Sequence, residues 1–437
     1  MNRTSLWRIG LTLLLASSLF GLATITSADD NELVAGYIAD EVILKLFHHS
    51  DLTAVANQYH LGLPPLDQFG TRPIYRLRIL DGVDAQVKAD IMASDGRIEY
   101  AEPNYLLETP EAQRGRRRWV IGGDAGTFAA QWSTSVLRLS QAHQMSQGAG
   151  VTVAVLDTGV DLSHPVLAGR LMAGFDFVDF DAVPQEEGTA TTNPAYGHGT
   201  HVAGIIALVA PAARIMPVRV LDAEGVGNSW VLAEGLRYAT DPDGNPATND
   251  GAQVINLSLG TLRPTALVEE LLAELACDDD DDDNDDCAYG HGIVVVAAAG
   301  NSGDSTPHYP AAEQASNLLA VAATTATDTL AEFSTRGPWV TISAPGDQIV
   351  STVPGGQYGT WSGTSMAAPH VAGVVALVRT QRPSLPADQV VQHVVSTAQP
   401  IASPAPVRIN PLGSLDWPVG SSSSGMMQRA FIPLVTR

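Results

Sequence analysis

The chain has 437 residues, of which 45% are hydrophobic and 16% are charged, a composition typical of a folded protein rather than a disordered one. This length suffices for two or three domains. The formal net charge of −23 argues against nucleic acid and anionic membranes as partners, because both repel an acidic surface.

The first 28 residues have the layout of a secretory signal peptide. Arg3 and Arg8 precede an apolar run over residues 9–23, and small residues follow as far as Ala28, after which we expect cleavage. The apolar run is shorter than the roughly 20 residues that a membrane-spanning helix needs. We therefore expect a secreted, extracellular protein that has no membrane span once the signal is removed.

Residues 29–118 alternate strand-like and helix-like stretches. Strands are expected at residues 42–47, 74–80 and 98–101, and helices at residues 52–59 and 83–92. This pattern predicts a small α+β domain. It ends at a basic cluster made by Arg114, Arg116, Arg117 and Arg118.

The pattern of residues 119–416 indicates an α/β fold. Short β-branched runs at 151–156, 254–257 and 293–297 alternate with alanine-rich helical stretches. Such alternation predicts a mostly parallel sheet with helices on both faces. Residues 417–437 follow as a serine-rich linker and an apolar tail.

Three motifs of this large segment carry candidate catalytic residues. V-L-D-T-G-V-D places Asp157 at the carboxyl end of a buried strand, where open α/β sheets hold their sites. G-H-G-T-H-V-A-G places His198 at the start of an apolar helix. G-T-S-M-A-A-P-H places Ser365 beside a helix start, whose free N–H groups favour negative charge. Taken singly, the three residues also fit a turn, a structural histidine and a helix cap.

Taken together, the three residues indicate acyl transfer. A serine nucleophile needs a base, and the base needs an acid to orient it. V-V-V-A-A-A-G-N-S-G adds Asn301, an amide that can stabilise an oxyanion. An α/β-hydrolase fits less well, because its elbow reads G-x-S-x-G and its order is Ser, Asp, His. A zinc site at His198 and His201 lacks a suitable third ligand, and an inactive relative would be expected to lack one of the four residues.

The motifs D-T-G-V-D, H-G-T-H-V-A-G and G-T-S-M-A-A-P-H-V-A-G, in this order, resemble those of the subtilisin-like serine proteases (subtilases) over about residues 130–400. The resemblance implies a subtilisin-like fold and a serine endopeptidase. It also implies that Asp157 orients His198, that His198 acts as general base and then acid, and that Ser365 is the nucleophile. The Asn301 side chain and the Ser365 N–H would form the oxyanion hole.

The same resemblance implies polypeptide substrates and the segments that bind them. The strand that pairs with the substrate backbone would consist of Gly225, Val226 and Gly227. The pocket for the residue before the scissile bond would be lined by Ser258, Leu259, Gly260, Ala298, Ala299 and Gly300. Ser302 stands where some relatives carry an acid, so no strong preference for basic residues is expected.

The N-terminal α+β segment also has a counterpart in the family. I-E-Y-A-E-P-N-Y, residues 98–105, resembles the last strand of subtilase propeptides. This implies that residues 29–118 are a ferredoxin-like propeptide that assists folding and inhibits the enzyme, and an unrelated accessory domain is the alternative. We expect a monomeric zymogen that cleaves itself within residues 114–119.

One acidic stretch resembles the calcium loop of the thermitase-like subtilases. In G-F-D-F-V-D-F-D-A-V-P-Q, the side-chain ligands of a structural Ca²⁺ would be Asp176, Asp179, Asp181 and Gln185. The loop departs from the family pattern at Phe180, where a polar residue is usual, and in an insertion that follows Gln185. A solvated acidic turn is the alternative interpretation.

A second acidic stretch, C-D-D-D-D-D-D-N-D-D-C at residues 277–287, contains both cysteines of the chain. In an exported protein this spacing favours a Cys277–Cys287 disulfide. The stretch would be an insertion after a helix at residues 267–276. Two interpretations are open: an exposed loop whose charge is offset by bound Ca²⁺, or a solvated acidic tag that aids solubility.

Overall fold

The computed structural model describes residues 36–111, 120–245, 248, 250–276, 292–402 and 406–416. The predicted signal peptide, arginine cluster, aspartate loop and C-terminal tail lie outside these residues. At the centre lies a parallel sheet of seven strands in the order β13-β12-β11-β10-β6-β8-β7. Its strands are β6 (Thr152–Asp157), β7 (Phe175–Asp176), β8 (Arg214–Arg219), β10 (Val254–Leu257), β11 (Val294–Ala298), β12 (Leu318–Thr324) and β13 (Ile342–Pro345).

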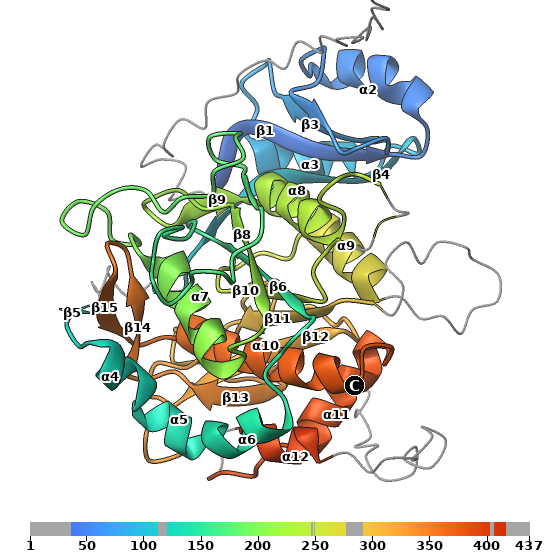
Figure 1. Ribbon diagram of the computed structural model, residues 1–437. Coiled ribbons are helices and arrows are strands. Elements are labelled where there is room, and N and C mark those ends of the chain that lie inside the picture. The colour runs from blue at the N-terminus through green and yellow to red at the C-terminus, as the bar shows by residue number, and fades with distance from the viewer. Residues whose placement is uncertain are drawn as a thin grey trace, which may run out of the picture.

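Helices cover both faces of this sheet because its strands are apolar on both sides. Along β6, Val153 and Val155 belong to one core cluster, and Ala154 and Leu156 belong to the other. The first face carries α7 (His198–Val209), α10 (Thr364–Gln381) and α11 (Ala387–Ser396), and the second carries α8 (Ser229–Thr240) and α9 (Ala266–Ala276) (Figure 1). This arrangement confirms the predicted α/β fold.

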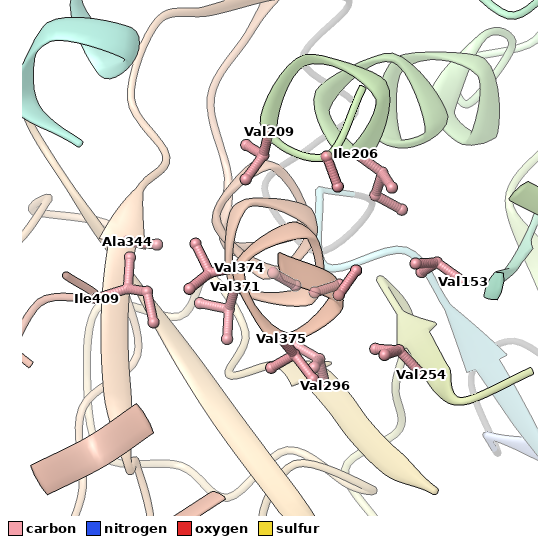
Figure 2. Packing of buried hydrophobic residues seen from close by; sticks show 14 of the residues in the cluster. Val153, Ile206, Val209, Val254, Val296, Ala344, Val371, Val374, Val375 and Ile409 are labelled. Carbon is pink, nitrogen blue, oxygen red and sulfur yellow. The ribbon is translucent and has the colours of Figure 1, made fainter. Parts of the chain in front are cut away.

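Helix α10 runs through the first core, and each of its residues from Thr364 to Arg379 is buried. Figure 2 shows its valines among apolar side chains of neighbouring elements, which include Val209, Val254, Val296, Ala344 and Ile409. This packing holds the first turn of α10, which carries Ser365, in a fixed place relative to the sheet.

The remaining elements border this core. Four short helices lie along the chain: α4 (Ala125–Ala129), α5 (Trp132–Val136), α6 (Leu139–Met145) and α12 (Pro411–Leu415). A small antiparallel sheet is made of β14 (Ile349–Val353), β15 (Gln357–Trp361) and β5 (Val120–Ile121). Among the described residues, no helix has the length and apolar character needed to cross a membrane.

Residues 36–111 form an N-terminal unit with the element order β-α-β-β-α-β. Its elements are β1 (Tyr37–Leu46), the short η1 (His49–Asp51), α2 (Leu52–Tyr59), β2 (Asp67–Gln68), β3 (Ile74–Arg78), α3 (Ala85–Met92) and β4 (Ile98–Glu108). The strands are antiparallel in the order β2-β3-β1-β4, which is the ferredoxin-like topology. The unit has a core of its own, to which Leu44, Leu77 and Met92 contribute.

The N-terminal unit docks on the outer side of α8 and α9 (Figure 1). Strand β4 is longer than predicted, because its pairing with β1 continues to Tyr105 and its last three residues pair with β9 (Val226–Asn228) of the large unit. The carboxylate of Glu102 caps α9 by accepting hydrogen bonds from the N–H groups of Ala266 and Leu267, at 2.7 and 3.1 Å. Lys45 Nζ donates to Glu270 Oε1 of α9 at 2.9 Å.

Candidate active site

Asp157 and His198 meet where α7 starts against the end of β6. The Nδ1 atom of His198 lies 2.7 Å from Oδ1 of Asp157, and both side chains are fully buried. The approach depends on Gly199, where a Cβ would lie 2.1 Å from the carbonyl oxygen of Gly159. The two glycine-containing motifs therefore act together to bring an acid and a histidine into contact.

The charges around His198 favour its protonated form. Burial lowers the pKa of His198, but the carboxylates of Asp157 and Glu111 outweigh burial and raise that pKa to about 10. The ring lies nearly perpendicular to that of Trp361, with the ring centroids 5.3 Å apart. The imidazole is thus held by a carboxylate on one side and an aromatic wall on another.

Ser365 is the second residue of α10, and its main chain is held in an unusual way. Pro369 lies four residues further on and has no N–H, so the carbonyl of Ser365 receives no hydrogen bond from that position of the helix. The hydroxyl of Ser258 donates to this carbonyl instead, at 3.1 Å. The proline of the serine motif therefore lets a predicted pocket segment anchor the residue that carries the hydroxyl.

Asn301 turns its amide nitrogen toward Ser365. Its Oδ1 accepts hydrogen bonds from the N–H and the hydroxyl of Thr364, at 2.9 and 3.1 Å. Because the oxygen is engaged there, Nδ2 points into the cleft. The N–H of Ser365 lies in the first turn of α10, where such groups have no acceptor within the helix.

The predicted peptide-pairing segments hold the end of the chain's own strand β4. Leu107 pairs with Gly227 and Glu108 with Val226, and the N–H of Thr109 donates to the carbonyl of Gly225 at 3.1 Å. On the other side, Glu108 and Gly260 exchange two backbone hydrogen bonds of 2.9 Å. An extended segment of the chain is therefore bound between the two sides of the cleft.

Glu111 follows this segment, and its carboxylate contacts the side chains of Ser365, His198 and Asn301. Its Oε2 accepts from Ser365 Oγ at 2.8 Å and lies 3.2 Å from His198 Nε2. Its Oε1 accepts from Asn301 Nδ2 at 3.1 Å. The predicted residues His198, Ser365 and Asn301 are thus brought together around one acid that sequence analysis did not identify, and Asp157 contacts the other ring nitrogen of His198.

The pocket segment 298–300 lies beside a buried histidine. Ala298 ends β11, and Ala299 packs against Ala322 and Val340. A Cβ on Gly300 would lie 2.5 Å from the ring of His308, and one on Gly260 would lie 3.1 Å from that ring. The His308 side chain therefore fills the space between the two glycines of the predicted pocket.

The predicted calcium loop is built around an arginine. Asp176 and Asp179 both accept from Nη1 of Arg219, which is buried on β8. Asp181 accepts from the N–H of Val183, and Gln185 Oε1 accepts from the N–H of Leu162. The guanidinium thus engages the first two of these residues, backbone N–H groups engage the other two, and the fit of Ca²⁺ to the same loop stays a prediction.

Among the described residues, one acidic group has ligand atoms close enough together to hold a metal ion. It consists of Asp241, Asp243 and Asp250, whose ligand atoms all lie within 4.8 Å of one another. These residues belong to a different loop from the predicted one. Exposed acidic groups of this kind are common without a metal.

Glu186 is a further residue that sequence analysis did not identify. Its carboxylate is buried and accepts hydrogen bonds from Thr158 Oγ1 at 2.6 Å and from the N–H and hydroxyl of Thr200, at 3.0 and 2.9 Å. Burial raises its pKa to about 8. Glu186 thus connects the residue after Asp157 to the first turn of the helix that carries His198.

Comparison with known proteins identifies the family. Residues 148–414 match the model of the subtilase family. This chain belongs to the subtilase family. It is a subtilisin-like serine protease, and proteases of this family act on polypeptides.

Named relatives of this subtilase cover different parts of it. Thermitase of Thermoactinomyces vulgaris is 39% identical over 57% of this chain and 82% of the relative. The thermophilic serine proteinase of Bacillus sp. (strain AK1) is 39% identical over 68% of this chain and 67% of the relative. M-protease of Shouchella clausii (strain KSM-K16) is 32% identical over 89% of this chain and 92% of the relative.

A solved structure shares the fold of the subtilase. The crystal structure of fervidolysin from Fervidobacterium pennivorans aligns with 87% of this chain at a TM-score of 0.68 and 24% sequence identity. This chain spans 61% of that structure. The match confirms the subtilisin-like fold.

Proposed function

We propose that this subtilase is a secreted serine endopeptidase in which Ser365, His198, Asp157 and Asn301 carry out peptide hydrolysis. The observation that carries the proposal is the meeting of these groups around a single carboxylate. Ser365 Oγ and His198 Nε2 both contact Oε2 of Glu111, at 2.8 and 3.2 Å. Asn301 Nδ2 contacts Oε1 of the same carboxylate at 3.1 Å. A scissile carbonyl placed there would face a nucleophile, a base and an oxyanion donor.

In this mechanism, Ser365 Oγ attacks the carbonyl carbon of the substrate while its proton passes to His198 Nε2. Asp157, fixed at 2.7 Å from Nδ1, stabilises the imidazolium that forms. The carbonyl oxygen becomes an oxyanion, held by Asn301 Nδ2 and the N–H of Ser365. Collapse breaks the C–N bond as His198 returns the proton to the leaving amine, and water repeats the sequence on the acyl-enzyme.

Residues 29–118 are proposed to be an inhibitory propeptide. The pairing of β4 with β9 and Gly260 supports this role, because a strand that occupies the substrate cleft excludes substrates. The proposed processing window, residues 114–119, lies outside the described residues. N-terminal sequencing of the secreted protein tests it, and a start far from this window would contradict it.

Three further expectations belong to the same proposal. A signal peptide ending at Ala28 would direct secretion, the processed enzyme would be a monomer, and Ca²⁺ would bind the 176–185 loop. The family relationship supports calcium, since subtilases commonly bind it. Arg219 contacts the carboxylates of Asp176 and Asp179, so Ca²⁺ would have to compete with this guanidinium for the two residues.

Substitution of the nucleophile tests the proposal. We expect Ser365→Ala to abolish casein hydrolysis, with a loss on the order of a millionfold in kcat, the size measured when subtilisin loses its serine. Ser396→Ala, at the end of α11 and remote from the cleft, is the matched control. A Ser365→Ala protein that hydrolyses casein like the control would overturn the assignment.

A further inference from the structure

Glu111 is bound as a ligand of the catalytic groups. The three hydrogen-bond partners that the structure shows for its carboxylate are Ser365 Oγ, His198 Nε2 and Asn301 Nδ2. The side chain is 7% exposed, and a carboxylate at such a depth is costly unless donors surround it. This set of donors satisfies both carboxylate oxygens.

The backbone before Glu111 explains why a side chain occupies this place. Glu108 and Gly260 form an isolated antiparallel bridge with two hydrogen bonds, and continuing this pairing by two residues on each side would place Pro110 opposite Ser258. A residue at this position would donate its N–H to the Ser258 carbonyl, but proline has none. The ladder therefore ends one residue before Glu111.

Oε1 of Glu111 lies where the oxyanion of a reacting substrate is expected. It lies 3.1 Å from Asn301 Nδ2. The space for it exists because residue 363 is a glycine: a Cβ added there would lie 1.8 Å from this oxygen. The other oxygen lies between the serine hydroxyl and the imidazole. A negatively charged group in this arrangement resembles the charge that develops when a substrate carbonyl is attacked.

We infer that the catalytic centre contains a carboxylate-binding subsite for an acidic side chain, and that Glu111 of the N-terminal unit is its ligand and shields Ser365 in the full-length chain. The inference rests on the proposed function and adds to it the inhibitory residue and its chemistry. The segment 106–111 is bound as an inhibitor and not as a substrate. Cleavage downstream requires the Glu111 side chain to leave the site first.

The rate at which Ser365 reacts with a fluorescent fluorophosphonate tests the inference on the full-length chain. Short labelling in the cold, followed by a denaturing gel, reports on the full-length band separately from processed enzyme. Glu111→Gln keeps the shape of the side chain but removes its charge, and Glu111→Ala removes the group. The matched control is Glu99→Gln, which removes the same charge from strand β4 outside the bound segment 106–111.

We expect both Glu111 variants to label about ten- to a hundredfold faster than the wild type, the size of one lost charge-assisted hydrogen bond. The control should label at the wild-type rate, and all variants should keep the wild-type circular dichroism spectrum. Equal rates for all four proteins, or faster labelling of the control alone, would overturn the inference. A Ser365→Ala band that labels like the wild type would instead overturn the proposed function.

Discussion

Gly363 offers a sharp test of where the oxyanion forms. Its backbone is extended, with φ 174° and ψ 167°, so alanine fits the main chain without strain. The added Cβ, however, would lie 1.8 Å from the position of Glu111 Oε1 and 3.2 Å from Asn301 Nδ2. Since Cβ atoms essentially never approach a neighbour closer than 3.0 Å, an oxygen at this position has to move by more than about 1 Å.

A displacement of this size costs roughly 10²-fold in rate, and subtilisin loses about 10²–10³ in kcat without its oxyanion asparagine. We therefore expect Gly363→Ala to lower kcat by about 10²-fold or more while the melting temperature stays near that of the wild type. The assay is steady-state hydrolysis of a chromogenic peptide, with processing completed by a trace of wild-type enzyme. Gly122→Ala is the control, because its Cβ meets no atom within 4 Å. A Gly363→Ala enzyme with the kcat of this control would refute the assignment of the oxyanion position.

The remaining predictions concern pH, calcium and the substrate pocket. In the unprocessed Ser365→Ala chain, the raised pKa of His198 stabilises the fold in full below pH 6.5, and this stabilisation is lost as pH rises toward about 10. Thermal melts should show that the melting temperature falls as pH rises, and the fall should be less steep when Glu111→Gln is added. Identical slopes with and without Glu111→Gln would count against the Glu111–His198 pair. Calcium should raise the melting temperature of the processed enzyme by mass action, and the rise should be smaller in the Asp181→Asn variant. If EDTA changes neither the melting temperature nor the rate of autolysis, the loop does not bind calcium. His308→Gly should favour a larger residue before the scissile bond. The ratio of kcat/KM for a substrate with phenylalanine there to kcat/KM for one with alanine should rise by about tenfold or more, and an unchanged ratio would show that the His308 ring does not line the pocket.

The fold was largely predictable because its signals are local. The predicted strands at 151–156, 254–257 and 293–297 correspond to β6, β10 and β11 within one residue at each end. The helix predicted at 52–59 matches α2, and the one predicted at 83–92 begins two residues later, where Asp84 accepts hydrogen bonds from the N–H groups of Gln86 and Val87. Apolar periodicity and capping residues determine these elements.

The parts that were missed depend on contacts between distant segments. Strand β4 extends to Glu108, well past the predicted end at residue 101, because β1 pairs with it as far as Tyr105 and β9, more than 100 residues later in the chain, pairs with its last three residues. Glu111, Glu186 and Arg219 carry no motif, and each gains its role from groups that only the fold brings close. The four motif residues could be proposed from sequence because their chemistry needs fixed neighbours in sequence.

The burial of α10 has a consequence for how this protein loses activity on heating. A helix enclosed by the sheet and by other helices cannot fray without opening the whole core, so its amide hydrogens should exchange only through global unfolding. The serine hydroxyl is attached to that helix and is further held through its own carbonyl. Thermal inactivation should therefore follow the all-or-none melting of the large unit. We expect no earlier phase in which Ser365 leaves its place while the rest of the large unit stays folded.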